Sequence, residues 1–369
     1  MSQTKVGYIG VDHHHRDPYL QLSAKLPVEM VALCEPGKEY TAADIRPHTD
    51  RPDEIATDGA DIGAIAERAE IYADPTELIA DADVDVIWVT YRNDEVPGFI
   101  DSAIEHGVDV ICEKPLARTA ADLRPLAERA DEADVTVGVN YIYRYTAASQ
   151  ALKERVDGGF FGDIWSVDGR YIGSKLDYRN RSHYIYDDAI SRGGSLQWIG
   201  IHWIDLFMYV LGEPIASVCA RSRTPSDGDI DEGIIVQFET DSGIMGTFQT
   251  GYYLGEPEKD TRFAVYGENA TADTPLHHNR SRRSTVPLDI VSDGDGWVTA
   301  PKRRTEFEYG YERFPAWGDY VWKFFADYFD GRESGAIPAD IHDAVRVLSV
   351  LDAAYESVDG DGWVEVEGV

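Results

Sequence analysis

The chain has 369 residues, of which 43% are hydrophobic and 11% are aromatic. This length is typical of two domains, and the apolar fraction is enough for a core in each, which excludes an intrinsically disordered chain. The 67 acidic residues outnumber the 34 basic ones and give a formal net charge of -33, so nucleic acid and anionic membranes are poor partners.

Lysine is scarce, since only nine of the basic residues are lysine. An acidic, lysine-poor surface keeps a protein hydrated in concentrated salt, which also screens its self-repulsion. We therefore predict a cytoplasmic protein of a halophile. Cys34, Cys112 and Cys219 are far apart in apolar runs and are predicted to be small buried side chains in a reducing compartment. We find no signal-peptide core and no membrane span in the sequence.

The first 140 residues alternate strands and helices. Strands are predicted at 5–11, 28–34, 84–90, 108–112 and 135–139, because each is a short, β-branched apolar run. Helices are predicted at 17–26, 62–69, 75–80, 96–106 and 120–133, and the acidic stretch 40–69 is a candidate insertion. This alternation predicts an α/β domain with a doubly wound parallel sheet, opening with the strand–helix–strand unit of dinucleotide folds.

After residue 140 several strands follow one another. They are predicted at 164–172, 217–223, 233–239, 244–253 and 262–267, and polar turns such as Asp241-Ser242-Gly243 indicate a mostly antiparallel sheet. Helices are predicted at 147–156, 195–211, 318–329 and 341–358, and the second of these should cover one side of the sheet. Residues 272–307 are interpreted as a solvated loop, with a substrate-phosphate clamp as the alternative. That stretch holds the basic residues Arg280, Arg282, Arg283, Lys302, Arg303 and Arg304.

The strand at 108–112 ends in residues that are suited to chemistry. It stops at Glu113-Lys114-Pro115, and Pro115 cannot continue the ladder, so the chain turns at the carboxyl edge of the sheet. Ligands of open α/β sheets bind at that edge. Lys114 could there exchange a proton with a substrate hydroxyl or carbonyl. The alternative is an ordinary solvated loop lysine.

Several segments form a wider pattern: Val6 to Gly10, Glu35, Cys112 to Leu116, Gly193 to Leu196, and His202 with Asp205. Over nearly the whole chain this pattern resembles the family of glucose-fructose oxidoreductase, inositol dehydrogenase and the rhizopine-catabolism protein MocA. The resemblance implies a Rossmann domain at 1–140 that binds a nicotinamide cofactor and an α+β substrate and oligomerisation domain at 141–369. It also implies an active-site role for Lys114, a last helix that packs back on the first domain, and a homo-dimer or homo-tetramer.

The first strand–helix turn departs from that pattern. The resemblance calls for glycine at positions 10, 12 and 15, and only Gly10 is present. Glycine at position 12 would let backbone N–H groups close on the pyrophosphate, whereas Asp12 adds a negative charge there. Either His13, His14 and His15 hydrogen-bond the phosphate or a metal ion, or the cofactor sits differently or is lost. Adjacent histidines on a tight turn should not all aim at one ion, so no metal site is predicted.

Glu35 ends the second strand, 25 residues beyond Gly10, where an acid would accept the ribose hydroxyls. A carboxylate there repels a 2′-phosphate, which predicts NAD rather than NADP. As a bare residue, Glu35 would more often be a surface acid. The resemblance places Thr90 and Asn93 near the nicotinamide ribose. The predicted cofactor set is then Gly10, Asp12, His13, Glu35, Thr90, Asn93, Glu113 and Lys114.

A helix in the second half carries the candidate substrate residues. Trp198, His202, Asp205 and Tyr209 are spaced to share one face. The alternative is a core histidine that is satisfied by Asp205. In many proteins of the resembled family an aspartate stands four residues before this histidine, and here that position is Trp198, whose indole could stack on a sugar or cyclitol. Further pocket candidates are Arg144, Tyr171, His183 and Tyr186.

Together these features predict an NAD-linked oxidoreductase of a sugar, polyol or cyclitol. Lys114 would be the acid/base, and His202 would orient the substrate or relay a proton. One rival is a ligand-binding or regulatory relative without turnover, which Asp12 and Trp198 support. A second rival is a non-redox lyase or glycosidase that uses NAD transiently. Net turnover of added NAD separates the main hypothesis from both rivals.

Overall fold

The computed structural model describes residues 3–47, 61–176, 183–226, 228–255, 259–276, 285–294, 297, 299–308, 310–360 and 362–368. The chain divides into two compact units. Unit 1 contains Met1–Ala117, Ala121–Ile142 and Gly310–Ala344, and unit 2 contains Arg118–Ala120, Tyr143–Tyr309 and Val345–Val369. Among the helices of the described residues, none has the length and apolarity needed to cross a membrane.

Unit 1 is built on a parallel sheet with the order β3-β2-β1-β4-β5-β6. This is the doubly wound order of dinucleotide folds, so the predicted fold class is confirmed. Its strands are β1 (Thr4–Ile9), β2 (Val28–Cys34), β3 (Glu70–Tyr72), β4 (Val86–Val89), β5 (Asp109–Cys112) and β6 (Val137–Val139). Strand β3 was not predicted, because its three residues are exposed or half-buried and carry no apolar run.

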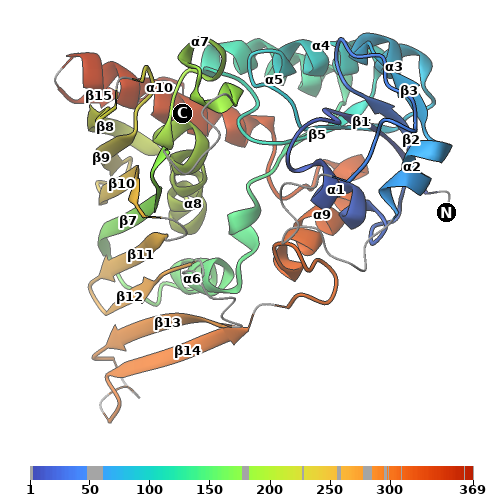
Figure 1. The fold of residues 1–369 in the computed structure, drawn as a ribbon. Coiled ribbons are helices and arrows are strands. Elements are labelled where there is room, and N and C mark those ends of the chain that lie inside the picture. The colour runs from blue at the N-terminus through green and yellow to red at the C-terminus, as the bar shows by residue number, and fades with distance from the viewer. Residues whose placement is uncertain are drawn as a thin grey trace. The chain divides into compact units, whose positions relative to one another are not determined.

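Helices cover both faces of this sheet (Figure 1). They are α1 (Arg16–Ser23), α2 (Ile62–Arg68), α3 (Pro75–Asp81), α4 (Val96–His106), α5 (Ala120–Ala133) and, from late in the sequence, α9 (Asp319–Gly331). In α9, Phe325 stacks on Trp88 of β4 with ring centroids 4.4 Å apart, and Tyr328 donates a hydrogen bond to the Val110 carbonyl at 2.8 Å. The helix predicted at 318–329 therefore completes the cover of the first sheet. Of the candidate insertion at 40–69, residues 48–60 lie outside the described residues.

Unit 2 is built on a sheet with the order β14-β13-β12-β11-β7-β10-β9-β8-β15. All neighbouring strands are antiparallel except β7 and β10, which are parallel. The predicted mostly antiparallel sheet is confirmed. The strands are β7 (Ile164–Ser174), β8 (Ile215–Arg223), β9 (Gly233–Thr240), β10 (Met245–Leu254), β11 (Asp260–Gly267), β12 (Ala270–Thr274), β13 (Thr285–Ser292), β14 (Lys302–Glu308) and β15 (Val364–Glu365).

The predicted loop at 272–307 is wrong for the described residues, because β12, β13 and β14 occupy most of it (Figure 1). Strand β14 was missed because its side chains are nearly all exposed and show no apolar alternation. Its charges are used on the sheet: Arg304 and Lys302 both pair with Asp289 of β13. Arg303 lies over the Trp297 ring at 3.9 Å. The other basic residues of that stretch, at 280, 282 and 283, lie outside the described residues.

The helices of unit 2 include the predicted substrate helix, which packs on one face of this sheet. Phe207 of α8 stacks on Phe263 of β11, with ring centroids 4.9 Å apart. The α-helices are α6 (Ala147–Asp157), α7 (Asp188–Ser191), α8 (Ile201–Leu211) and α10 (Ile341–Gly360), and a π-helical turn, η4 (Leu196–Gly200), precedes α8. Short 3-10 turns are η1 (Ile142–Tyr145), η3 (Tyr184–Tyr186) and η5 (Arg332–Ser334). The first four residues of α10 belong to unit 1 and the rest to unit 2.

Cysteine burial follows the sequence-based expectation in two of three cases. Cys34 and Cys112 are buried at the ends of β2 and β5, and Cys219 is half-buried in β8. All three are free thiols.

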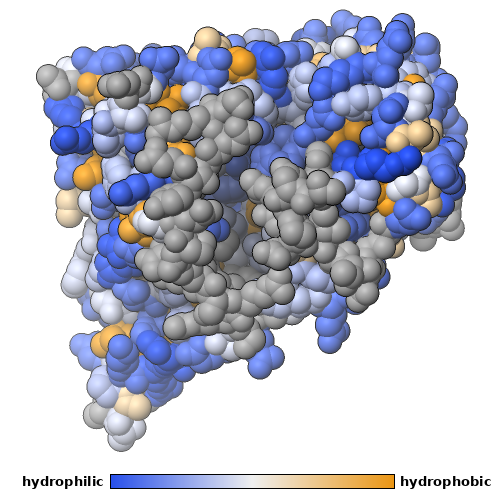
Figure 2. All heavy atoms as spheres, viewed as in Figure 1, coloured by the Kyte–Doolittle hydropathy of each residue, from blue (hydrophilic) through white to orange (hydrophobic). Residues whose placement is uncertain are grey.

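The surface shown in Figure 2 is mostly hydrophilic, in keeping with the net charge of -33. Like charges repel least when salt shortens their range to a few ångströms. We therefore expect the melting temperature to be highest in molar KCl or NaCl and to fall steadily in dilute buffer. Thermal melts across a salt series measure this. Equal or higher midpoints at low salt would remove the halophile interpretation.

Candidate active site

Gly10 lies at the carboxyl end of β1, at the edge of the first sheet. Its φ is +104°, and a Cβ at this position would lie 2.0 Å from the Thr90 carbonyl oxygen, so no other residue fits without moving the backbone. The Thr90 hydroxyl hydrogen-bonds that of Tyr8 at 2.7 Å and links the ends of β1 and β4. Asn93 is buried and donates to the Ala117 carbonyl at 3.4 Å. Gly10, Thr90 and Asn93 thus lie along the edge where the sequence placed them.

Glu35 and Asp12 are joined at the end of β2. A carboxylate oxygen of Glu35 accepts the Asp12 backbone N–H at 2.7 Å. The Asp12 carboxylate forms an ion pair with Lys38 and accepts from the Tyr40 hydroxyl at 3.0 Å. Burial raises the pKa of Glu35 to about 7, although the Asp12 N–H opposes this rise. The N–H that a glycine at position 12 would offer to a phosphate is therefore bound to Glu35, and the Asp12 charge is shared with Lys38.

The three histidines gather at the start of α1, so the premise that adjacent histidines on this turn cannot all aim at one ion is not supported. Ring centroids lie 4.3 Å apart for His13 and His14, 4.1 Å for His14 and His15, and 5.0 Å for His13 and His15. One ligand atom from each lies within 4.8 Å of the others. His13 Nδ1 accepts the His15 backbone N–H at 3.2 Å, and His15 Nδ1 contacts Glu113. The absence of a metal site stays a prediction.

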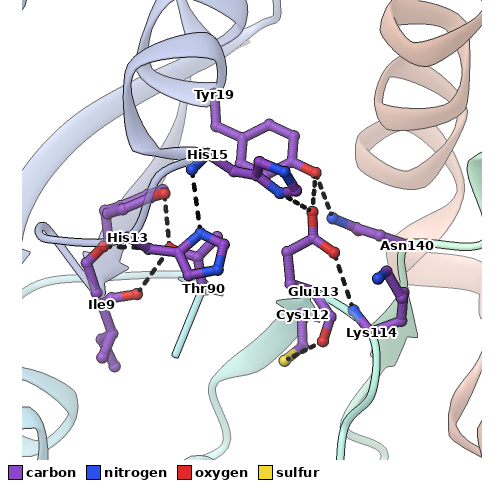
Figure 3. Close-up of polar contacts among 11 residues, drawn as sticks. Ile9, His13, His15, Tyr19, Thr90, Cys112, Glu113, Lys114 and Asn140 are labelled. Atoms are coloured by element: carbon purple, nitrogen blue, oxygen red, sulfur yellow. Dashed lines mark hydrogen bonds and ion pairs between the residues drawn. The ribbon is translucent and has the colours of Figure 1, made fainter. Parts of the chain in front are cut away.

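Glu113 is the centre of a buried hydrogen-bond network (Figure 3). Its Oε1 contacts His15 Nδ1 at 2.9 Å and accepts the Tyr19 hydroxyl, and its Oε2 accepts the Lys114 backbone N–H at 3.1 Å. Asn140 in turn donates to the Tyr19 oxygen at 3.2 Å. Burial opposes ionisation, yet the bonds from His15 and Tyr19 and the charge of Lys114 hold the pKa of Glu113 well below its usual range. Glu113 is therefore a fixed, buried carboxylate.

Lys114 follows β5 and is half-buried. Burial lowers the pKa of its ammonium, while the Glu113 charge acts in the opposite direction. A lysine with a lowered pKa is closer to the condition of a proton donor and acceptor near neutral pH. Its environment thus suits the acid/base role proposed for it.

In unit 2 a buried carboxylate holds the start of the predicted substrate helix, which comprises η4 and α8. Asp231 accepts hydrogen bonds from the Gly194 N–H at 2.7 Å, the Ser195 hydroxyl at 2.7 Å, the Leu196 N–H at 3.1 Å and the Tyr355 hydroxyl at 2.9 Å. A Cβ on Gly194 would lie 1.9 Å from the Asp231 carbonyl oxygen, which explains the glycine there. Sequence analysis missed Asp231, because it lies 36 positions from Ser195 and no local pattern marks it.

Trp198, His202 and Asp205 were predicted to share one face of a continuous α-helix. In the structure Trp198 lies in the π-helical turn η4, and the other two lie in α8. His202 packs on Tyr143 with ring centroids 4.5 Å apart. Asp205 is bound by Arg144, whose Nε lies 3.0 Å and 3.1 Å from its two oxygens; sequence analysis did not foresee this partner. Trp198, within the π turn, meets the edge of Tyr184 at 5.7 Å. The π turn alters the helical phase between Trp198 and His202.

The remaining candidates lie in three places within unit 2. Tyr171 meets Trp203 edge-on at 5.2 Å, and Trp203 also contacts Tyr143, which places Tyr171 in the group of His202. His183 packs on Tyr184 at 4.6 Å and so joins the group of Trp198. Tyr186 packs against the buried cluster of Leu176, Ile230 and Tyr252.

Family models match both parts of the chain. The model described as "Oxidoreductase family, NAD-binding Rossmann fold" matches residues 5–141, and "GFO/IDH/MocA C-terminal domain" matches residues 149–273. Together they cover more than half of the chain. The chain belongs to the Gfo/Idh/MocA family. NAD is the cofactor named in the description of the matched Rossmann fold.

Several proteins that are similar in sequence are dehydrogenases. A levoglucosan dehydrogenase of Pseudarthrobacter phenanthrenivorans is 22% identical over 333 residues, which are 80% of this chain and 83% of that protein. An inositol 2-dehydrogenase of Burkholderia multivorans is 31% identical over 221 residues, which are 57% of this chain and 60% of that protein. The solved structure of levoglucosan dehydrogenase with NADH and levoglucosan aligns over 99% of this chain and 100% of that chain, with a TM-score of 0.81 and 20% identity. That likeness shows a shared fold.

Proposed function

We propose that the protein is an NAD-dependent oxidoreductase that transfers hydride between the nicotinamide cofactor and a hydroxyl or carbonyl group of a sugar, polyol or cyclitol. The observation that carries this proposal is the fixed Glu113-Lys114-Pro115 loop at the carboxyl edge of a Rossmann sheet in a Gfo/Idh/MocA chain. The sugar and cyclitol dehydrogenases among its relatives support the substrate class.

The residues of unit 1 fit a dinucleotide. Gly10 permits close approach at the end of β1, and Glu35 stands at the end of β2. The buried Asn140 Oδ1 has no hydrogen-bond partner among the described residues and can accept an N–H group of a ligand. We assign the cofactor to residues 1–140, with contacts from Gly10, Asp12, His13, Glu35, Thr90, Asn93, Glu113 and Lys114. Because the Asp12 N–H is bound to Glu35, His13 is proposed to donate to the phosphates.

The protein's own part in the reaction is alignment and proton transfer. NAD, when bound, accepts the hydride, or supplies it in its reduced form. Lys114 takes the proton from the substrate hydroxyl, or returns it to the carbonyl in the reverse reaction. Glu113 holds the loop that carries Lys114. His202 orients the substrate or relays the proton, and the remaining proposed substrate contacts are Trp198, Arg144, Tyr171, His183 and Tyr186.

We also propose where the protein works and how it associates. We assign the part of residues 141–369 that forms unit 2 to the substrate and to self-association as a homo-dimer or homo-tetramer in the cytoplasm. Ile235 and Met245 are exposed apolar residues on neighbouring strands of the second sheet and would suit a contact between copies. Light scattering in molar KCl measures the oligomer.

A substrate panel tests the proposed function. The protein in molar KCl is mixed with NAD and a series of sugars, polyols and cyclitols, and the absorbance of reduced nicotinamide is followed. Net reduction with a member of the panel is expected. Binding of NAD without reduction would favour the regulatory rival, and substrate conversion without net reduction would favour the lyase or glycosidase rival.

Glu35 leads to an expected pH dependence of cofactor choice. Its ionised carboxylate accepts a ribose 2′-OH and repels a 2′-phosphate, and its pKa is raised to about 7. Protonation of Glu35 removes this repulsion of the 2′-phosphate. The ratio of NAD affinity to NADP affinity should therefore be largest above pH 7 and should decrease as the pH falls through 7. Calorimetric titration of both nucleotides above and below pH 7 measures it. Glu35→Gln should flatten the dependence, and a preference for NADP at high pH would contradict the role of Glu35.

A further inference from the structure

His15 connects the cofactor turn to the Lys114 loop. It stands at a position where the glycine pattern of the resembled family would place no side chain, and its Nδ1 lies 2.9 Å from Glu113 Oε1. Glu113 lies one residue before Lys114 and accepts its backbone N–H. Because residue 15 is histidine rather than glycine, its side chain can bind the carboxylate of Glu113, the residue before Lys114.

The contact is set by the start of α1. His15 lies just before α1, and Tyr19 lies within α1, one helical turn after His15. Both side chains therefore reach the same oxygen of Glu113 (Figure 3). The two rings meet edge-on at 5.9 Å. Trp317 lies against both, at 4.7 Å from His15 and 5.3 Å from Tyr19. These contacts restrict the orientation of the imidazole.

The direction of the hydrogen bond follows from the charges. Glu113 is ionised, so it can only accept, and His15 must donate from Nδ1. The groups that face Glu113 are His15 and Tyr19 from the start of α1 and Lys114 from its own loop. The rings of His13 and His14 lie beside His15. Two donors on Oε1 and one on Oε2 thus hold this carboxylate in place.

We propose that His15 is a positioning residue for Lys114: by holding Glu113 it keeps the carboxylate from turning onto the lysine ammonium. A carboxylate released from His15 can turn toward the ammonium of Lys114, whose charge already acts on it. That pairing would favour the charged amine and remove it from proton transfer. The inference rests on the proposed function only for its effect on turnover.

Labelling of Lys114 by an amine-acylating reagent tests this inference without a substrate. The rate is measured against pH by mass spectrometry in the wild type, in His15→Gly and in His15→Asn, whose amide can donate from nearly the place of Nδ1. In His15→Gly the labelling profile of Lys114 should move to higher pH, and each unit of movement lowers the neutral amine about tenfold at a given pH. His15→Asn should stay close to the wild type. The profile of Lys323, an exposed lysine on α9, is the internal control.

An unchanged profile in His15→Gly, or a shift to lower pH, would overturn the inference. If His15→Gly does not fold, Tyr19→Phe removes the other donor from the same oxygen and should shift the profile in the same direction. Once a substrate is known, His15→Gly should lower kcat while NAD binds as tightly as before, because the substitution restores a glycine to the turn. If the substrate panel shows no turnover, the proposed function is rejected. The labelling experiment still tests the role of His15, because it needs no substrate.

Discussion

Replacing Lys114 by methionine is expected to lower turnover by roughly 10²- to 10⁴-fold, the usual contribution of a positioned acid/base. Methionine keeps a long apolar side chain and removes the proton. The fold of the loop should survive, because Glu113 binds the backbone N–H of residue 114 rather than its side chain. The melting temperature should therefore stay near that of the wild type, and NAD should still bind through the other proposed cofactor contacts. Steady-state rates, calorimetry and thermal melts on the same preparation measure the three quantities.

Two further variants define what the Lys114 result means. Lys323→Met removes an exposed lysine that pairs with Asp327 and should leave turnover unchanged. His202→Asn should cost less than Lys114→Met, because Trp198 replaces the aspartate that would share its work. Near-normal turnover in Lys114→Met would reject the mechanism. A larger loss at His202 than at Lys114 would move the acid/base role to the substrate helix.

Asp205→Ala is expected to destabilise unit 2 by about 3–5 kcal/mol, as is typical when one partner of a buried ion pair is removed. The carboxylate is nearly inaccessible, with a relative exposure of 1%, and Arg144 binds it through Nε. Without Asp205 the guanidinium would remain buried with less compensation, next to the Tyr209 ring. Urea unfolding in molar KCl should show a lower midpoint.

The matched control for this ion pair is Asp168→Ala. Asp168 pairs with Arg262 on the second sheet, but both side chains are about one-third exposed, and exposed pairs contribute about 0–1 kcal/mol. Its unfolding midpoint should change little. Equal losses in the two variants would show that burial does not determine the contribution of the Arg144 and Asp205 pair.

The fold was largely predictable because its core strands are short apolar runs. The bounds of β2 were predicted to the residue, and β4, β5 and β6 lie within the predicted runs, whereas β1 begins one residue before its predicted run. Apolar patterning reports burial, and these strands are buried on both faces. Strands β3 and β14 escaped prediction for the same reason, since neither has a buried face. Their strand conformation depends on pairing with neighbours that are far away in the sequence.

The site residues that could be predicted from the sequence are those that lie at the end of a strand. Gly10, Glu35 and Lys114 are of this kind, because strand, turn and spacing locate them. The partners that hold the site are long-range contacts: Glu113 with His15, Asp205 with Arg144, and Asp231 with Ser195. Each pair joins residues more than 30 positions apart, so no local pattern could have matched them.

Transfer of deuterium from substrate to cofactor tests the central claim most directly. A polyol or sugar that is active in the panel is prepared with deuterium on the reacting carbon, and the cofactor is analysed by mass spectrometry after turnover. Direct hydride transfer predicts that the label is recovered in the nicotinamide ring, in an amount equal to the product formed. Product formation with unlabelled cofactor, or with label lost to water, would contradict the account.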